Sequence, residues 1–418
     1  MRIQRTLPPA AAPIKWQDLL CGLAGILFGG QAVEKLEFEI REYFGVKHVF
    51  LVSSGKAALT LILLALKRLS DKRQVLIPAY TCFSVPSAIV KAGLQVALCD
   101  INPASFDFDQ KLLHEAITED TLCIVPHHLF GISADMDRIV SLCKERGIFV
   151  VEDVAQAMGG SYGGKKLGTI GDVGFFSLGR GKNITCGAGG IIITNSDRIA
   201  EVIAEYDRGL EEPGVMEAVK EFCRLALMSM FIHPRLYWLP AGMPSLRLGQ
   251  TVFHSEFPIK KMSGLSAGVL YRWRDRLEES NRARAGTAAY FSERLRINSA
   301  RDTSIPYLRL PILVDSPEVK SRVHFLSRQM GLGITPMYPT PINEIEEITT
   351  AFKGRAFPSA SRAAERLLTI PTHALLSDKD RNNICRLFTE VPVLDKRRVR
   401  ETDDLAGKPA ALNSVEIR

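Results

Sequence analysis

An acidic residue and a lysine each follow an apolar segment in the middle of the chain. Asp153 comes shortly after the apolar run 148–151, and Lys182 lies in a glycine-rich turn after the apolar run 173–178. Because ligands bind at the carboxyl ends of strands in parallel α/β sheets, we expect both side chains to reach one crevice. Such a pair suits pyridoxal phosphate (PLP), since the lysine can form a Schiff base while the carboxylate keeps the pyridine nitrogen protonated.

The same two residues also have an ordinary structural interpretation. An acid at a strand end often caps a helix, and a lysine in a loop is most often a solvated charge. A Schiff-base lysine must also lose its proton, which requires burial or a nearby cation because the pKa of a free lysine is about 10.4. Spacing alone therefore leaves both interpretations of Asp153 and Lys182 open.

The elements that must position this pair follow a repeated strand–turn–helix pattern. Apolar segments such as 45–55, 74–81 and 122–131 alternate with amphipathic helical patterns such as 135–147. Segments that are apolar on both faces and separated by helices are typical of a mostly parallel sheet covered on both sides, so the fold class is predicted to be α/β. The expected divisions are a flexible arm (1–14), a large α/β domain (15–270) with an apolar insertion (about 215–257), a small C-terminal α+β domain (271–395) and a disordered tail (396–418).

The composition is that of an ordinary folded protein. Of 418 residues, 46% are apolar and 24% are charged, which excludes disorder for most of the length. The net charge of +7 is too dilute for a nucleic-acid-binding face. The eight cysteines are scattered without a Cys-x-x-Cys pair, so neither a disulfide framework nor a zinc cluster is expected, and no other metal-ligand spacing is present.

Two apolar segments bear on the location of the protein. The stretch 19–28 is short for a membrane span, which favours a cytoplasmic protein. The segment 222–253 is rich in leucine, methionine and aromatic residues but contains three prolines, so it cannot be one membrane-spanning helix. It is either a buried or subunit-interface insertion, or an element that rests on the inner face of a membrane with Arg224, Arg235 and Arg247 near lipid phosphates.

Six segments of the chain resemble one enzyme family. They are "FGGQAVEKLEFEIREYFGVKHVFLVSSGKAAL", "IPAYTCFSVPSAIVKAGLQVALCDINPASFDFD", "VPHHLFGISADMDRI", "VVEDVAQAMGGSYGGKKLGTIGDVGFFSLGRGKNITCGAGG", "PMYPTPI" and "LLTIPTHALLS". In these segments, which span residues 28–380, the chain is similar to the DegT/StrS-type sugar aminotransferases of the aspartate aminotransferase superfamily. The resemblance implies the PLP-transferase fold type I: a mostly parallel seven-stranded sheet sandwiched by helices, with a smaller C-terminal α+β domain. It also implies a homodimer, because the family's active site borrows residues from a second subunit.

The resemblance implies a role for each matching residue. Lys182 matches the lysine that forms the Schiff base with PLP and then moves the proton between cofactor and substrate carbons. Asp153 matches the acid beside the pyridine nitrogen, and Gln156 matches a glutamine near the phenolic oxygen. Ser177 matches a serine that contacts the cofactor phosphate.

A turn that opens a helix is expected to bind the same phosphate. Gly55, Lys56 and Ala57 match the family's Ser-Gly-Thr-Ala turn, and the backbone N–H groups of a helix N-terminus favour a dianion independently of the resemblance. The family's threonine is Lys56 here, which removes a hydroxyl but supplies a positive charge.

Other positions depart from the family pattern. The aromatic residue expected to stack on PLP is Cys82, so either its sulfur packs against the ring or Tyr80 or Phe83 replaces it. Lys260 or Lys261 stands where a neighbouring subunit usually supplies an asparagine to the phosphate. Further departures are Ala188 in place of an acid, and Met337 and Asn343 in place of histidines. The residues expected to contact the substrate are Phe83, His128 and Tyr338.

The favoured function is a PLP-dependent aminotransferase that moves an amino group from an amino acid, expected to be glutamate, to a keto-sugar on a nucleotide or lipid carrier. Such a reaction belongs to cell-surface polysaccharide, glycolipid or secondary-metabolite biosynthesis. One alternative is a PLP-dependent sugar dehydratase, although that branch of the family has a histidine in place of the lysine. The other is a non-catalytic, membrane-associated regulatory protein of the same fold.

Overall fold

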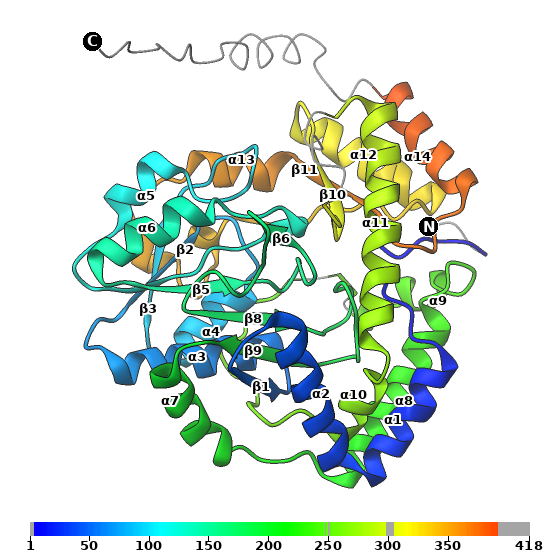
Figure 1. Ribbon diagram of the computed structural model, residues 1–418. Coiled ribbons are helices and arrows are strands. Elements are labelled where there is room, and N and C mark those ends of the chain that lie inside the picture. Colours follow the sequence, from blue (N-terminus) through cyan, green and yellow to red (C-terminus); the bar gives the residue numbers. More distant parts are fainter. Residues whose placement is uncertain (1–3, 247, 250, 298–304, 392–418) are drawn as a thin grey trace, which may run out of the picture.

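A seven-stranded sheet forms the centre of the molecule (Figure 1). The computed structural model describes residues 4–246, 248–249, 251–297 and 305–391. Within these residues the strand order is β1-β9-β8-β5-β4-β2-β3, and β9 alone runs antiparallel to its neighbours. The strands are β1 (His48–Val52), β2 (Gln74–Pro78), β3 (Gln95–Cys99), β4 (Thr121–Ile124), β5 (Phe149–Asp153), β8 (Val173–Ser177) and β9 (Gly190–Thr194). The prediction of a mostly parallel, seven-stranded sheet is confirmed.

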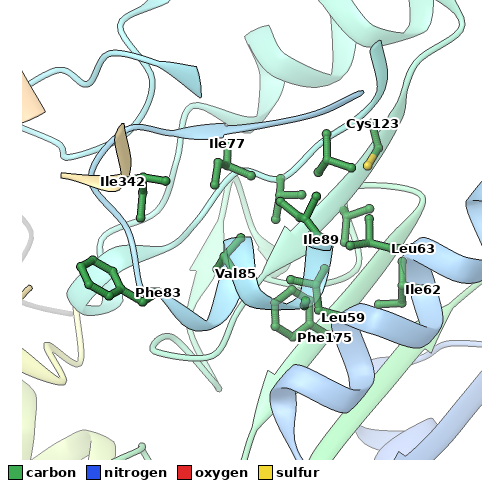
Figure 2. Packing of buried hydrophobic residues seen from close by; sticks show 14 of the residues in the cluster. Leu59, Ile62, Leu63, Ile77, Phe83, Val85, Ile89, Cys123, Phe175 and Ile342 are labelled. Atoms are coloured by element: carbon green, nitrogen blue, oxygen red, sulfur yellow. The ribbon is translucent and has the colours of Figure 1, made fainter. Parts of the chain in front are cut away.

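Helices cover both faces of this sheet. One face carries α3 (Gly55–Leu69), α4 (Ser84–Lys91) and α7 (Asp197–Arg208), and the other carries α2 (Gly29–Phe44), α5 (Gln110–Ala116) and α6 (Met136–Arg146). Figure 2 shows how Leu59 and Ile62 of α3 and Ile89 of α4 pack with Ile77 and Phe175 of the strands. α3 is buried on almost all sides, which explains why its sequence is apolar around most of the helix.

A smaller unit lies beyond the carboxyl ends of the strands. Its two-stranded sheet pairs β10 (Arg309–Leu313) with β11 (Leu367–Pro371), and it is packed by α12 (Pro317–Met330) and α14 (Asp378–Glu390). The long helix α11 (Trp273–Leu295) runs from the large unit to this one (Figure 1). Shorter elements complete these two units: α13 (Pro358–Arg366), the hairpin of β6 (Ser161–Tyr162) and β7 (Lys165–Lys166), and the 3-10 turns Leu129–Gly131, Ile342–Glu344 and Thr349–Phe352.

The N-terminal segment corrects the expectation of a flexible arm at 1–14. Leu7 and Ala11 are each only 1% exposed. The backbone N–H of Leu7 donates to the carbonyl of Gly331 at 2.9 Å, and that of Thr6 donates to the carbonyl of Pro234 at 2.9 Å. The small side chains let the described part of this segment lie against the body of the protein. The tail expected at 396–418 lies outside the described residues.

The apolar insertion lies along the edge of the large unit, beside the first helix. α8 (Val215–Phe231), α9 (Trp238–Ala241) and the turn Pro244–Leu246 form it, and α8 contacts α1 (Trp16–Leu27), which packs on α10 (Gly264–Val269). Among the described residues no single helix is long and apolar enough to cross a membrane. α1 and α2 pass that test only as a pair, bent by 119° at their junction.

Candidate active site

A cavity of about 270 Å³ lies where β5, β8 and the start of α3 meet. It brings together most of the residues that the sequence predicted. The predicted residues that line it are Gly55, Lys56, Cys82, His128, Asp153, Gln156, Ser177, Lys182 and Tyr338. Asp153 and Lys182 therefore face one space, although they come from different turns of the chain.

Burial acts on both members of this pair. Burial raises the pKa of Asp153, while a hydrogen bond from the N–H of Ala155 (2.9 Å) and the charge of Lys182 lower it in part. Burial also lowers the pKa of Lys182, and the nearby charge of Arg309 adds to this decrease against the opposing effects of Cys82 and Asp153. The lowered pKa eases loss of the proton from Lys182, and the neutral amine is the nucleophilic form.

The first turn of α3 provides an anion site beside this pair. The hydroxyl of Ser54 accepts a hydrogen bond from the N–H of Ala57 at 3.1 Å, whereas the N–H groups of Gly55 and Lys56 have no acceptor among the described residues. Free N–H groups and the helix dipole together favour a phosphate. A Cβ on Gly55 would lie 2.8 Å from the Cβ of Ser177, so only glycine lets the helix start approach that serine so closely.

Lys56 adds a positive charge to the same end of the cavity. Its ammonium group lies 4.4 Å from the ring centroid of Phe257, and burial lowers its pKa. A cation held over an aromatic face, with no carboxylate bonded to it in the described part of the chain, remains available to an anion.

A pair of polar side chains forms the wall next to the smaller unit. The amide nitrogen of Gln156 donates to the hydroxyl of Tyr338 at 2.8 Å, and its carbonyl oxygen accepts from the N–H of Phe130 at 3.2 Å. Tyr338 is 2% exposed and its ring lies 5.4 Å from that of Tyr80. These contacts fix the orientation of Gln156 and close the cavity on this side.

His128 is held by contacts within the protein. Its Nδ1 accepts from the N–H of Ala134 at 3.1 Å, so Nε2 carries the hydrogen and donates to Glu152 at 3.2 Å. Burial opposes ionisation of Glu152, but the hydrogen bonds from His128 and from the N–H groups of Gly171 and Gly168 lower its pKa. Both ring nitrogens of His128 are therefore occupied, and it offers a substrate only the face of its ring.

The donor set fits PLP. An anion site at the start of α3, a buried carboxylate and a lysine with a lowered pKa lie around one cavity, as a phosphate, a pyridine nitrogen and an aldehyde on one ring require.

Comparison with known proteins agrees with this geometry. A sequence model of the DegT/DnrJ/EryC1/StrS aminotransferase family matches residues 22–389, nearly the whole chain. The chain belongs to this family. The prediction made from the six sequence segments is confirmed.

Several curated proteins are similar to this DegT family member. A pleiotropic regulatory protein of Geobacillus stearothermophilus is 38% identical over 41% of this chain and 46% of its own length. GDP-perosamine synthase of Caulobacter vibrioides is 36% identical over 41% of this chain and 46% of its own length. The chain thus spans about half the length of these relatives. A UDP-2-acetamido-2-deoxy-3-oxo-D-glucuronate aminotransferase of Pseudomonas aeruginosa is 25% identical over 86% of this chain and 90% of its own length.

Solved structures share the fold of this DegT family member. PseC of Helicobacter pylori, an aminotransferase of pseudoaminic acid biosynthesis, superposes with a TM-score of 0.75 at 17% identity, over 93% of this chain and 99% of PseC. At this identity the likeness concerns the fold alone, and it agrees with the sheet order described above.

Two predicted site residues of this DegT family member lie outside the cavity. Phe83 is 6% exposed, belongs to the hydrophobic core, where Figure 2 shows it near Ile342, and is not among the residues that line the cavity. Tyr80 is fully buried as well, which leaves Cys82 as the cavity-lining residue at the position of the stacking aromatic. The N–H of Ala57 is used by Ser54 and is not free for a phosphate.

The two lysines expected to reach a second subunit are already paired within the chain. Lys260 donates to Glu217 at 2.9 Å, and Lys261 lies 3.4 Å from Glu212. Either lysine would have to break its ion pair before its side chain could contact a second subunit.

Two arginines were missed by the sequence analysis. Arg284 of α11 is fully buried and donates to the carbonyls of Leu308 (2.7 Å), Ala11 (2.8 Å) and Lys182 (3.4 Å), so it ties three separate segments to the lysine turn. Burial lowers its pKa to about 9. Arg309 of β10 lies near Lys182, and its Nε atom is buried without a hydrogen-bond partner among the described residues.

Proposed function

We propose that this chain is a PLP-dependent aminotransferase that moves an amino group from an amino acid to a keto-sugar. Membership of the DegT/DnrJ/EryC1/StrS family supports this reaction class. The observation that carries the proposal is the single cavity that holds Lys182, Asp153 and the anion site of α3. When bound there, PLP supplies an electron-accepting ring that stabilises negative charge on the substrate carbon.

Each residue around that ring has a separate proposed role. The Nζ atom of Lys182 takes a proton from the carbon of the donor and returns it to the carbon of the acceptor, for which a lowered pKa is suited. Asp153 would accept a hydrogen bond from the protonated pyridine nitrogen of bound PLP, and the buried Glu152–His128 pair supports the end of the strand from which Asp153 projects. Gln156 offers a polar contact near the phenolic oxygen, as the family resemblance implies.

Arg309 supports an amino acid as the donor. Arg309 makes only long contacts, 3.5 Å to Thr335 and 3.7 Å to the sulfur of Met337, and it has no carboxylate partner among the described residues. A half-buried guanidinium without a counter-ion favours an incoming carboxylate, which it can bind through two parallel hydrogen bonds. Glutamate is the donor we propose.

Replacing Arg309 with methionine is expected to raise the KM for the donor about tenfold or more, because a charge-assisted hydrogen bond contributes roughly 1.5–3 kcal/mol. The KM for the keto-sugar is expected to change little. Steady-state kinetics with glutamate varied at a saturating acceptor would measure this effect, and Arg309→Lys, which keeps the charge, is expected to fall between the two. An unchanged donor KM in Arg309→Met would remove Arg309 from donor recognition.

Replacing Gly55 with alanine is expected to weaken PLP binding about tenfold or more, because the added Cβ would lie 2.8 Å from the Cβ of Ser177 and push the helix start away from the phosphate. Gly30→Ala is the matched control, since a Cβ there meets no atom within 4 Å. Titration of the apo-proteins with PLP, followed by absorbance, would compare the two. Equal affinities would show that α3 does not hold the phosphate.

The acceptor we propose is a keto-sugar on a nucleotide or lipid carrier, and we propose a cytoplasmic homodimer. The names of the Caulobacter and Pseudomonas relatives support a nucleotide-linked sugar. A dehydratase is disfavoured because Lys182 is present, and a non-catalytic regulator is disfavoured because the cavity keeps Lys182, Asp153 and the anion site of α3.

The half-reaction with an amino donor tests this function directly. Purified protein saturated with PLP is expected to show a visible absorbance band that glutamate abolishes, with release of one 2-oxoglutarate per bound cofactor. A keto-sugar is then expected to restore the band and to appear as an amino-sugar by mass spectrometry. A bound cofactor that no amino acid converts would contradict the proposal, and light scattering would give the subunit number.

A further inference from the structure

Helix α1 exposes a stripe of large apolar residues and buries two glycines and an aspartate. Its exposed large apolar residues recur at helical spacing: Trp16 (66% exposed), Leu20 (54%), Leu23 (39%) and Leu27 (79%). Gln17 and Ala24 are exposed beside them. Its buried residues are Asp18, Gly22 and Gly25. A surface helix of a globular protein normally turns its apolar stripe to the core and its polar residues to solvent. In α1 only Leu19 and Ile26 pack partly against the core, while the larger apolar stripe faces outward.

Close backbone packing fixes α1 in this orientation. A Cβ on Gly25 would lie 2.1 Å from the carbonyl oxygen of Gly264, and one on Gly268 would lie 2.4 Å from that of Cys21. No other residue type permits this contact between α1 and α10. The inward carboxylate of Asp18 lies 3.3 Å from Arg272, which is an interaction that rotation of the helix would break. Leu20, Leu23 and Leu27 therefore stay on the outside.

Helix α8 presents a second apolar stripe beside the first. Four of its exposed apolar residues again recur at helical spacing: Met216 (68%), Val219 (44%), Leu227 (55%) and Met230 (48%). Val215 (71%), at the first position of the helix, is exposed as well. α8 contacts α1 at the edge of the molecule (Figure 1). We call the exposed apolar residues of both helices the α1–α8 face. Such a large exposed apolar surface marks an interaction site.

Positive charges border the α1–α8 face. At 3.6 residues per turn, Lys220 and Arg224 lie about 40° and about 80° around α8 from Met216 of the apolar stripe. Together with Arg180 they line a cavity of about 400 Å³. Among the described residues these three cations form no ion pair, so the cavity can accept an anion.

The acids of this cavity are already bonded elsewhere. Glu217 accepts from the ammonium of Lys260 at 2.9 Å, and Glu221 accepts from the hydroxyl of Ser266 at 2.8 Å. A two-fold contact with a second copy would pair this patch with itself, so the three unpaired cations would meet a patch whose own cavity acids are already bonded. Glu34 is an exposed acid too, but it lies on α2, on the other side of the bend between α1 and α2. A surface of anionic phosphates supplies the charge that a second copy lacks.

We infer that the α1–α8 face docks this enzyme onto an anionic membrane surface. The leucines, methionines and Trp16 enter the boundary between headgroups and acyl chains, while Lys220, Arg224 and Arg180 bind lipid phosphates. α1 has 12 residues. It is therefore about 18 Å long and too short for a hydrocarbon core of about 30 Å, so it lies in the plane of the interface. This inference concerns location and is independent of the reaction proposed above.

Vesicle flotation of the full chain tests the docking. The wild-type protein is expected to float with mixed phosphatidylcholine–phosphatidylglycerol vesicles, and to float less at high salt. The variant Leu20→Ser/Leu27→Ser/Met216→Ser/Leu227→Ser is expected to lower the partition coefficient by at least about tenfold. The variant Lys220→Gln/Arg224→Gln is expected to lower it about tenfold for the anionic vesicles, with little change for pure phosphatidylcholine. Phe325→Ser is the matched control, because Phe325 of α12 is 60% exposed but far from this face in the chain.

Three outcomes would overturn the docking. One is a wild-type protein that stays at the bottom of the gradient. Another is equal flotation of the wild type and both multiple variants, with circular dichroism showing that all are folded. The third is a drop in particle mass by light scattering in the apolar variant with no change in flotation, which would assign the face to a second copy of the chain.

Discussion

Lys182→Ala is expected to lower the transamination rate by about 10³–10⁴-fold, because positioned acid–base groups contribute up to about 10⁴-fold and no second amine is placed to take over the proton. Lys56 lines the same cavity but lies over Phe257, at the end that receives the phosphate. The variant is still expected to bind PLP, since the start of α3 and Asp153 are untouched. Its visible absorbance band is expected to be lost or shifted.

The experiment compares single-turnover rates with glutamate for the wild type, Lys182→Ala and Lys165→Ala. Lys165 is exposed on the β6–β7 hairpin, so its loss controls for the removal of a positive charge. A small primary amine added to Lys182→Ala is expected to restore part of the rate, because it replaces the missing base. A Lys182→Ala protein with wild-type turnover would end the proposed function.

The central sheet was predictable because each of its strands carries its own signal. Segments such as 74–78 and 148–151 are short and largely apolar, and these properties do not depend on distant contacts. The pairing of Asp153 with Lys182 followed from the same rule, since the carboxyl ends of strands meet at one edge of the sheet. The family resemblance then assigned the roles that spacing had left open.

The contacts that sequence could not predict are long-range and depend on backbone atoms. The N-terminal segment reads as flexible because it contains prolines and alanines, yet Arg284 and the ring of His373 hold its carbonyls at Ala11 and Pro8 at 2.8 Å each. Every residue has a carbonyl, so such anchoring leaves no pattern in the segment itself. An arginine within a helical pattern is likewise read as a solvated charge.

Orientation around a turn was the other source of error. Cys82 and Phe83 are neighbours in the chain, but Cys82 lines the cavity and Phe83 enters the core. The start of α4 at Ser84 decides which side chain points in which direction, and helix boundaries are the least predictable part of a sequence. The apolar face of α1 was hidden for a related reason: only the contact with α10 shows that its glycines face inward.

Asp153→Asn is expected to lower the turnover number by about 10²–10⁴-fold while the folded apo-protein becomes more stable at neutral pH. An amide cannot hold the proton on the pyridine nitrogen as a carboxylate does, so the ring accepts electrons poorly. The stability gain has a separate cause. Burial raises the pKa of Asp153 in the folded protein, so its ionised form costs stability that a neutral amide does not.

The raised pKa of Asp153 in the folded protein also sets how the stability of the protein changes with pH. A carboxyl group whose folded pKa is raised contributes its full stability below the unfolded pKa of about 3.9, and this contribution is lost as the pH rises through the folded value. Denaturant unfolding of the apo-proteins is therefore expected to favour Asp153→Asn at pH 7, with a difference that shrinks toward low pH. Asp71→Asn, at an exposed aspartate, should show neither the stability gain nor the loss of turnover.

The combination of the two effects is what distinguishes a functional carboxylate from a structural one. A structural carboxylate is stabilised by its partners, so its removal lowers both stability and activity. Asp153 has one hydrogen bond from a backbone N–H and lies in a cavity, so its carboxylate is less fully bonded than a structural one would be. If Asp153→Asn lost stability and turnover together, Asp153 would be a helix-capping residue, the interpretation that the sequence alone had left open.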